Sequence, residues 1–189
     1  MILTESINRI VRLEKDILDK FTSISIQINL PEGAVLLAEG KTSDEIYYVS
    51  AGLVRAYYFE DGKDVTSWLA YEGDFVCSLP SYLLRKPSRE TIQLLEPATL
   101  QVVNRIDLEA LRAQHDQIDD LQCALMQVYL LRYDNRIRLL RIPKAADRLK
   151  AFMAHSPRLY NRVPQRFIAS FLGIEPATLS RLRSGYRRR

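Results

Sequence analysis

The chain has 189 residues, of which 47% are hydrophobic and 26% charged, and its formal net charge is +4. This length can bury a substantial core, and the composition is that of an ordinary globular protein. No apolar run approaches the roughly 18 residues that a membrane-spanning helix needs, and the charged N-terminus MILTESINRIVRLEKDILDK does not contain the apolar stretch of a secretory signal. We therefore expect a cytoplasmic protein with no membrane partner.

Positive charge is concentrated near the end of the chain. From Tyr160 to Arg189 there are seven arginines and one acidic residue, Glu175, whereas the rest of the chain has 20 basic and 22 acidic residues. Such a segment attracts a polyanion, and nucleic acid is the most common polyanion in a cell. The alternative is a solvated basic tail, which suits the final three arginines better than the patterned stretch before them.

The first half of the chain reads as one short helix followed by many short strands. Ile7, Ile10, Val11 and Leu13 recur near helical spacing. From about Thr22 the apolar residues alternate in SISIQINL, and five further β-prone runs follow, most of them closed by glycine: AVLLAEG, EIYYVSAG, LVRAYYFEDG, VTSWLAYEG and DFVCSL. TIQLLEP and TLQVVN add two more. Short strands with regular turn signals predict a β-sandwich or a barrel-like roll.

After Asn104 the pattern becomes helical. Residues 105–114 predict a short helix, and Gln117 to Arg141 predicts a longer one with two apolar stripes. One stripe can pack on the roll while the other pairs with the same helix of a second subunit, or both can belong to the core of one chain. The stripes are Ile118, Leu121, Leu125 and Val128, and Met126, Leu130, Tyr133, Ile137 and Leu140.

Three helices are predicted near the end of the chain. The first spans Ala145 to Ala154; the second begins at Pro164, and Gly173 supplies the tight turn to the third, which begins near Pro176. Leu179 and Leu182 of the third helix face inward. Two short helices joined by a glycine turn are typical of a helix-turn-helix, although a generic helical hairpin has the same pattern. The residues left facing solvent are Ala177, Thr178, Ser180, Arg181 and Arg183.

A resemblance now covers nearly the whole chain. The order of roll, long helix and helix pair, together with IASFLGIEPATLSRLR, resembles the CRP/FNR family of bacterial transcription regulators. LVRAYYFEDGKDVTSWLAYEGDF and PSRETIQLLEP resemble its Bacteroidetes-type members. The resemblance implies an α+β chain: a cyclic-nucleotide-binding-like jelly roll (double-stranded β-helix) with an N-terminal helix in residues 1–116, a dimerisation helix in 117–141 and a helix-turn-helix domain in 142–189. It also implies a homodimer that binds double-stranded DNA at two-fold symmetric operators, with RNA polymerase as a further partner.

The ligand site departs from the family pattern. Members that bind cyclic AMP carry a glycine-glutamate pair for the ribose and an arginine-serine pair for the phosphate. Here Gly73 precedes the shorter Asp74, residues 84–87 lengthen the next segment, and the arginine position aligns with Ser88, beside Arg89. A buried phosphate without a cationic partner is poorly satisfied, so we do not expect cyclic AMP. Another small effector stays open, although its aromatic lining can equally be core: Tyr57, Trp68, Tyr71 and Phe75.

The DNA-reading helix departs from the family as well. The arginine and glutamate that well-known members present to the bases align with Pro176 and Ala177, while a later arginine is retained as Arg181. Base readout is then expected from Arg181 with Thr178, Ser180 and Glu175, and Arg183 is a further contact to bases or phosphates. The β-hairpin wing is missing after the helix. Phosphate contacts are expected instead from Arg187, Arg188 and Arg189.

Other site chemistries find little support. Cys77 and Cys123 are too few for an iron–sulfur cluster and are expected to be small buried hydrophobic residues. His115 and His155 are expected on the surface, and the roll contains no histidine for a cupin-type metal site. We expect no metal, no cofactor and no enzyme activity. The alternative to a regulator is a ligand-sensing or protein-interaction module whose helix-turn-helix no longer binds DNA, which would lack salt-dependent duplex binding.

Overall fold

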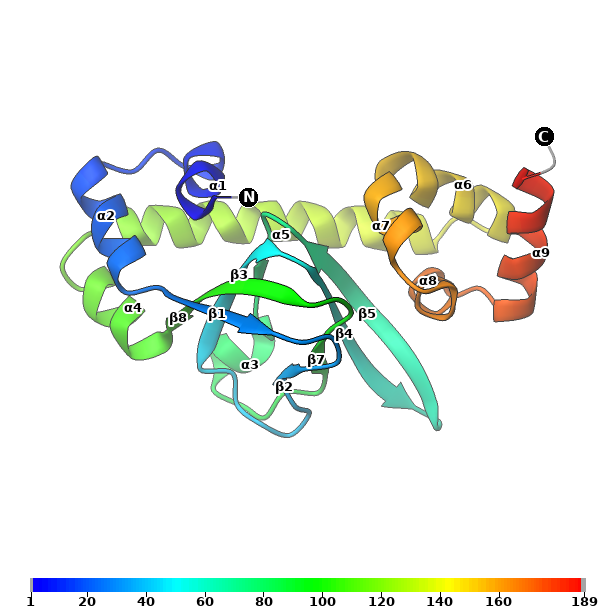
Figure 1. Cartoon of the computed structure of the whole chain (residues 1–189), viewed down its shortest axis with the longest axis horizontal. Coiled ribbons are helices and arrows are strands. Elements are labelled where there is room, and N and C mark those ends of the chain that lie inside the picture. The colour runs from blue at the N-terminus through cyan, green and yellow to red at the C-terminus, as the bar shows by residue number, and fades with distance from the viewer. Residues whose placement is uncertain (1, 188–189) are drawn as a thin grey trace.

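Two four-stranded antiparallel sheets form a β-sandwich beside one long helix (Figure 1). The structure is a computed structural model that describes residues 2–187, with side chains for residues 2–184. The strand order is β1-β8-β3-β6 in one sheet and β2-β7-β4-β5 in the other. The strands are β1 (Ile26–Leu30), β2 (Val35–Leu37), β3 (Glu45–Ala51), β4 (Leu53–Glu60), β5 (Lys63–Tyr71), β6 (Phe75–Val76), β7 (Thr91–Leu94) and β8 (Ala98–Asn104).

The roll forms because its strands alternate. Val54 and Ala56 of β4 point into the sandwich, where they pack with residues of both sheets, such as Ile92 and Leu100. Gly52 closes the turn between β3 and β4 at φ 117°, and a Cβ there would lie 2.6 Å from the Cβ of Ala98. The close approach and the positive φ both require glycine. The predicted β-roll is confirmed.

The long helix α5 runs along the sandwich and joins it to the C-terminal helices (Figure 1). Its inner stripe packs against the N-terminal helices in one apolar cluster that includes Leu3, Phe21, Ile118 and Leu121. The predicted helices at 105–114, 117–141 and 145–154 are confirmed as α4, α5 and α6. The helices are α1 (Leu3–Ile10), α2 (Lys15–Ser23), α3 (Leu79–Leu84), α4 (Arg105–Arg112), α5 (Gln117–Leu140), α6 (Ala145–His155), α7 (Pro157–Arg162), α8 (Gln165–Leu172) and α9 (Pro176–Arg187).

The prediction of a single N-terminal helix was wrong. The backbone becomes extended at Val11, and a second helix follows from Lys15 to Ser23. Leu13 reaches the same core as Ile7 through this break, so an apparently continuous helical spacing came from two elements. The strand expected from about Thr22 therefore begins only at Ile26.

Within the described residues, no helix combines the length and apolar character needed to cross a membrane. The helices α6 to α9 lie together at one end of α5 (Figure 1). They share a buried cluster in which Leu149, Ile168, Leu172 and Leu179 are almost fully inaccessible. Leu53 of strand β4 belongs to the same cluster, so the C-terminal helices and the outer face of the roll have one continuous core.

Candidate nucleic-acid interface

A tight turn between α8 and α9 sets the angle of the last helix. Gly173 has φ 59°, its N–H donates to the carbonyl of Ser170 at 3.1 Å, and the Ile174 N–H donates to the carbonyl of Ala169 at 2.9 Å. This pair of bonds is the Schellman arrangement of a helix end. Arg148 of α6 also donates to the carbonyls of Leu172 and Gly173, at 2.6 and 3.1 Å. The turn is thus held from both sides.

Helix α9 buries one face and exposes the other. Leu179 is 1% exposed, whereas Ala177, Ser180 and Arg181 are exposed and Thr178 is half-buried. Among the described residues, the Arg181 guanidinium bonds to the carbonyl of Ala177 at 3.4 Å and to Thr178 Oγ1 at 3.2 Å, both in its own helix. A nucleic acid could replace both contacts at little cost, because they are exposed.

The other five predicted contact residues are placed differently. Arg183 was expected to face solvent, but it is half-buried, with its guanidinium 4.4 Å from the centre of the Tyr160 ring. This correction follows from the position of α7, which covers that side of α9. Glu175 is exposed before the first turn of α9, where its carbonyl accepts the Thr178 and Leu179 N–H groups. The side chain of Arg187 and the whole of Arg188 and Arg189 lie outside the described residues.

The predicted effector residues are spread over the roll. Gly73 and Asp74 form the turn between β5 and β6. Tyr71 packs against the buried cluster of the C-terminal helices, whereas Trp68 packs against the interior of the roll. Asp74 is 4% exposed; its carboxylate accepts the Tyr71 N–H at 3.0 Å and forms an ion pair with Arg132 of α5 at 2.6 Å. Gly73, at φ 95°, allows this turn. Asp74 is thus already occupied by a cation from its own chain, and it connects the roll to the long helix.

The remaining effector residues do not enclose a ligand. Ser88 is buried and donates to the carbonyl of Glu90 at 2.7 Å, and Trp68 Nε1 donates to the Glu90 carboxylate at 3.2 Å. Arg89, beside them, is exposed. The small cavity of about 50 Å³ lies elsewhere, between apolar side chains of α1, α2, β3 and α5. With Asp74 paired and no cation at Ser88, these residues do not fit a cyclic nucleotide.

The cysteines and histidines have separate environments. Burial raises the pKa of the Cys77 thiol to about 12, whereas Cys123 is exposed on α5, so the prediction that Cys123 is buried was wrong. His155 is exposed as predicted. His115 lies in the loop before α5, 3.3 Å from Lys20 Nζ, and is half-buried. The part of the chain that the structure describes contains no group of three or more His, Cys, Asp and Glu residues that could hold a metal ion.

Comparison with known proteins finds relatives of the roll. Residues 27–115 match the model of the cyclic nucleotide-binding domain. Over these residues the β-roll is similar to cyclic nucleotide-binding domains. No curated protein matches the sequence, but solved structures do. FixK2 from Bradyrhizobium japonicum is 20% identical with a TM-score of 0.75, over 87% of this chain and 85% of that one.

Two further solved structures share this fold over most of the chain. The c-di-GMP responsive global regulator CLP from Xanthomonas campestris is 16% identical, with a TM-score of 0.72 over 93% of this chain and 92% of that one. A regulator of the CRP/FNR family from Eubacterium rectale is 14% identical, with a TM-score of 0.71 over 93% and 84%. The resemblance to CRP/FNR proteins, with their cyclic nucleotide-binding domain and long helix, is thereby confirmed for the fold.

Proposed function

We propose that the chain is a DNA-binding transcription regulator that acts as a homodimer and reads a two-fold symmetric operator. The observation that carries the proposal is the exposed face of α9. Its small and cationic residues Ala177, Ser180 and Arg181 face solvent while Leu179 anchors the helix in the core. A short helix of this kind, set by a glycine turn against a preceding helix, fits the major groove. The names of similar structures describe regulators of gene expression.

The second apolar stripe of α5 supports the dimer. Met126, Leu130, Tyr133, Ile137 and Leu140 are 37% to 69% exposed, although they recur at intervals of three and four residues. This spacing is the a/d repeat of a two-helix coiled coil. A second copy of α5 would cover the stripe and would place two copies of α9 on one duplex, with half-sites roughly one helical turn, about 34 Å, apart.

The proposal does not require an effector. A ligand that used Asp74 would have to break its ion pair with Arg132, which removes a buried carboxylate from its partner. The simplest mechanism is therefore constitutive DNA binding. An effector that shifts the position of α5 through Asp74 is the alternative that the same contact allows.

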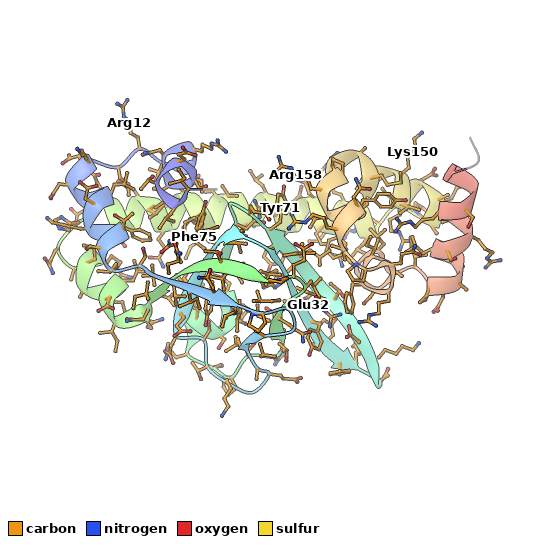
Figure 2. The ribbon with its side chains drawn as sticks, in the orientation of Figure 1. Arg12, Glu32, Tyr71, Phe75, Lys150 and Arg158 are labelled. Atoms are coloured by element: carbon orange, nitrogen blue, oxygen red, sulfur yellow. The ribbon has the colours of Figure 1, made fainter. Side chains whose placement is uncertain are left out.

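Selection from a random duplex library at near-physiological salt tests the function. The wild-type protein should enrich a two-fold symmetric site, and Arg181→Ala should weaken binding to it by about 1–3 kcal/mol, since a bidentate arginine contact to guanine is lost. Arg158→Ala is the matched control: Arg158 is exposed on α7, away from α9 (Figure 2), and should bind as the wild type does.

Two outcomes would contradict the proposal. Equal loss of affinity for Arg158→Ala and Arg181→Ala would show that charge alone, and not the face of α9, attracts the duplex. Failure to enrich any DNA sequence would favour the alternative hypothesis, a sensing or interaction module whose helix pair no longer binds DNA.

A further inference from the structure

Strand β4 carries a buried cation on the face that is turned away from the roll interior. Arg55 is 2% exposed, although the neighbouring residues Val54 and Ala56 point into the sandwich. Its guanidinium forms a bidentate pair with Asp64 of β5, with both N–O distances 2.8 Å. A cation in the middle of a strand is thus neutralised within the β4–β5 hairpin and remains flat against the sheet.

Helix α8 covers this cation. The Arg55 guanidinium packs against two aromatic rings, 4.0 Å from the centre of the Tyr57 ring and 3.7 Å from that of Phe167. Tyr57 belongs to the hairpin and Phe167 to α8, so the stack joins the roll to the first helix of the reading pair. Guanidinium groups favour such stacking, and burial strengthens it.

Ser170, one turn beyond Phe167, forms hydrogen bonds with the edge strand β5. Strand β5 lies at the edge of its sheet, where backbone groups have no neighbouring strand. The Thr66 N–H donates to Ser170 Oγ at 2.8 Å, and that hydroxyl donates to the carbonyl of Asp64 at 3.0 Å. One side chain of α8 therefore takes the place of a strand partner at two backbone groups.

The same face of α8 also meets the long helix. Phe171 follows Ser170, and the Arg136 guanidinium of α5 lies 3.5 Å from the centre of its ring. Phe167, Ser170 and Phe171 have the i, i+3, i+4 spacing of one helix face. That face thus contacts the β4–β5 hairpin and α5, while Ile168 and Leu172 pack in the cluster shared with Leu53 of β4.

We propose that contact with the β4–β5 hairpin fixes the orientation of the helix pair α8 and α9 relative to the roll. Arg55 and Ser170 are the positioning residues of this contact. The contact leaves the outer face of α9 exposed, so it orients the reading face and does not mask it. In a dimer, the angle between the two copies of α9 would then be fixed by two hairpins, and a change in the hairpin would reach the DNA through α8. This inference rests on the proposed function and adds a route separate from α5.

The test compares a whole operator with one half-site. Ser170→Ala removes the bridge to β5 without touching α9. In the full-length protein it should lower affinity for the selected operator by about tenfold, because the two misplaced copies of α9 no longer bind both half-sites together. Affinity for a single half-site should change less than about twofold. Thr99→Ala, which removes the hydroxyl bonded to Asn29 on the other sheet, should change neither.

Hydrogen exchange without DNA gives a second readout. The Thr66 amide and the amides of α8 should exchange about tenfold faster in Ser170→Ala than in the wild type, while α9 stays folded. Asp64→Asn, which weakens the hold on Arg55, should loosen the same peptides. Unchanged exchange and unchanged operator affinity in both variants would overturn the proposal that the hairpin orients α8 and α9. A gain in operator affinity would overturn it as well, since the contact would then be inhibitory.

Failure of the proposed function would look different. A wild-type protein that selects no DNA site would end the proposal of a regulator. The exchange of Thr66 and α8 would still decide whether the hairpin holds the helix pair.

Discussion

At the scale of single residues, Arg162 makes the densest set of charged contacts between the C-terminal helices and the roll. It pairs with Glu72 at 2.8 and 2.9 Å and with Glu96 at 2.6 and 3.2 Å. The hydrogen bonds from Arg162 and, after them, the N–H of Gly52 lower the pKa of Glu72 to about 2, against the opposing effect of burial. The ion pair should therefore persist well below neutral pH.

Stability should depend on this pair in acid. Because the pKa of Glu72 is lowered in the folded state, its contribution is fully present above the unfolded value near 4.5 and is lost as the pH falls toward about 2. Glu72→Gln should cost about 1 kcal/mol of unfolding free energy at pH 7, and less at each step from pH 4.5 to pH 3, as measured by urea unfolding.

Asp44→Asn is the control variant for Glu72→Gln, because it removes the charge of an exposed ion pair. Asp44 pairs with Arg85 at 2.5 Å at an exposed site of the roll, and such pairs contribute about 0–1 kcal/mol. A penalty for Glu72→Gln that stayed constant down to pH 3 would mean that the glutamate acts through packing and not through its charge.

The residues that sequence reasoning missed are cations with distant partners. Arg55 stands in a run of alternating apolar residues, where a charged side chain predicts a solvent-facing position, yet Phe167 covers it from more than 100 positions away. Asp74 was singled out for a ligand, but Arg132, 58 positions later, pairs with it. Periodicity describes local structure, and neither contact is local.

At the scale of elements, the long helix shows what periodicity does predict. Its two stripes were visible in the sequence, and the structure buries Ile118 and Leu121 while exposing Leu130 and Ile137. The exposed stripe continues one step toward the N-terminus, because Cys123 lies three residues before Met126 and is itself exposed. The unexpected exposure of this cysteine is thus part of the repeat. The split between α1 and α2 was not visible, since both helices pack on one core.

Charge on the exposed stripe should prevent pairing. Leu130 is 69% exposed, so Leu130→Glu should leave the fold of one chain intact and give a monomer in sedimentation at micromolar concentration. Operator affinity should fall by more than about 100-fold, because one short helix binds weakly alone. Gln127→Glu, an equal charge on an exposed residue outside the stripe, should remain dimeric.

The native Cys123 reports the direction of the helices in the same experiment. In a parallel pair the two Cys123 residues face each other, within the roughly 4–7 Å between Cα atoms that a disulfide needs. In an antiparallel pair centred on the stripe they would lie about 25 Å apart. Oxidation with diamide should cross-link the wild type but not Cys123→Ser. A dimer that never cross-links would contradict parallel pairing.

At the scale of the whole molecule, charge is separated along the chain. The excess of arginine lies in the last thirty residues, and the rest of the chain is slightly acidic. Exposed Lys150 of α6 extends the basic character to a helix beside α9 (Figure 2). A duplex would therefore be attracted to one end of each chain and not to the β-roll, and in a dimer both ends would act on the same duplex.

The salt dependence of binding should distinguish contacts to DNA phosphates from contacts to bases. Each phosphate contact contributes about 0.9 to the slope of log affinity against log salt. Removing residues 187–189 should flatten that slope by about 2–3 for one chain and lower affinity evenly for all sequences, since phosphate contacts carry no sequence information. Arg181→Ala should instead weaken the preference for the operator at the base that this arginine reads and change the slope by about 1 or less. A truncated protein with an unchanged slope would show that these arginines do not reach the phosphates, and attraction would then have to come from α6 and α9 themselves.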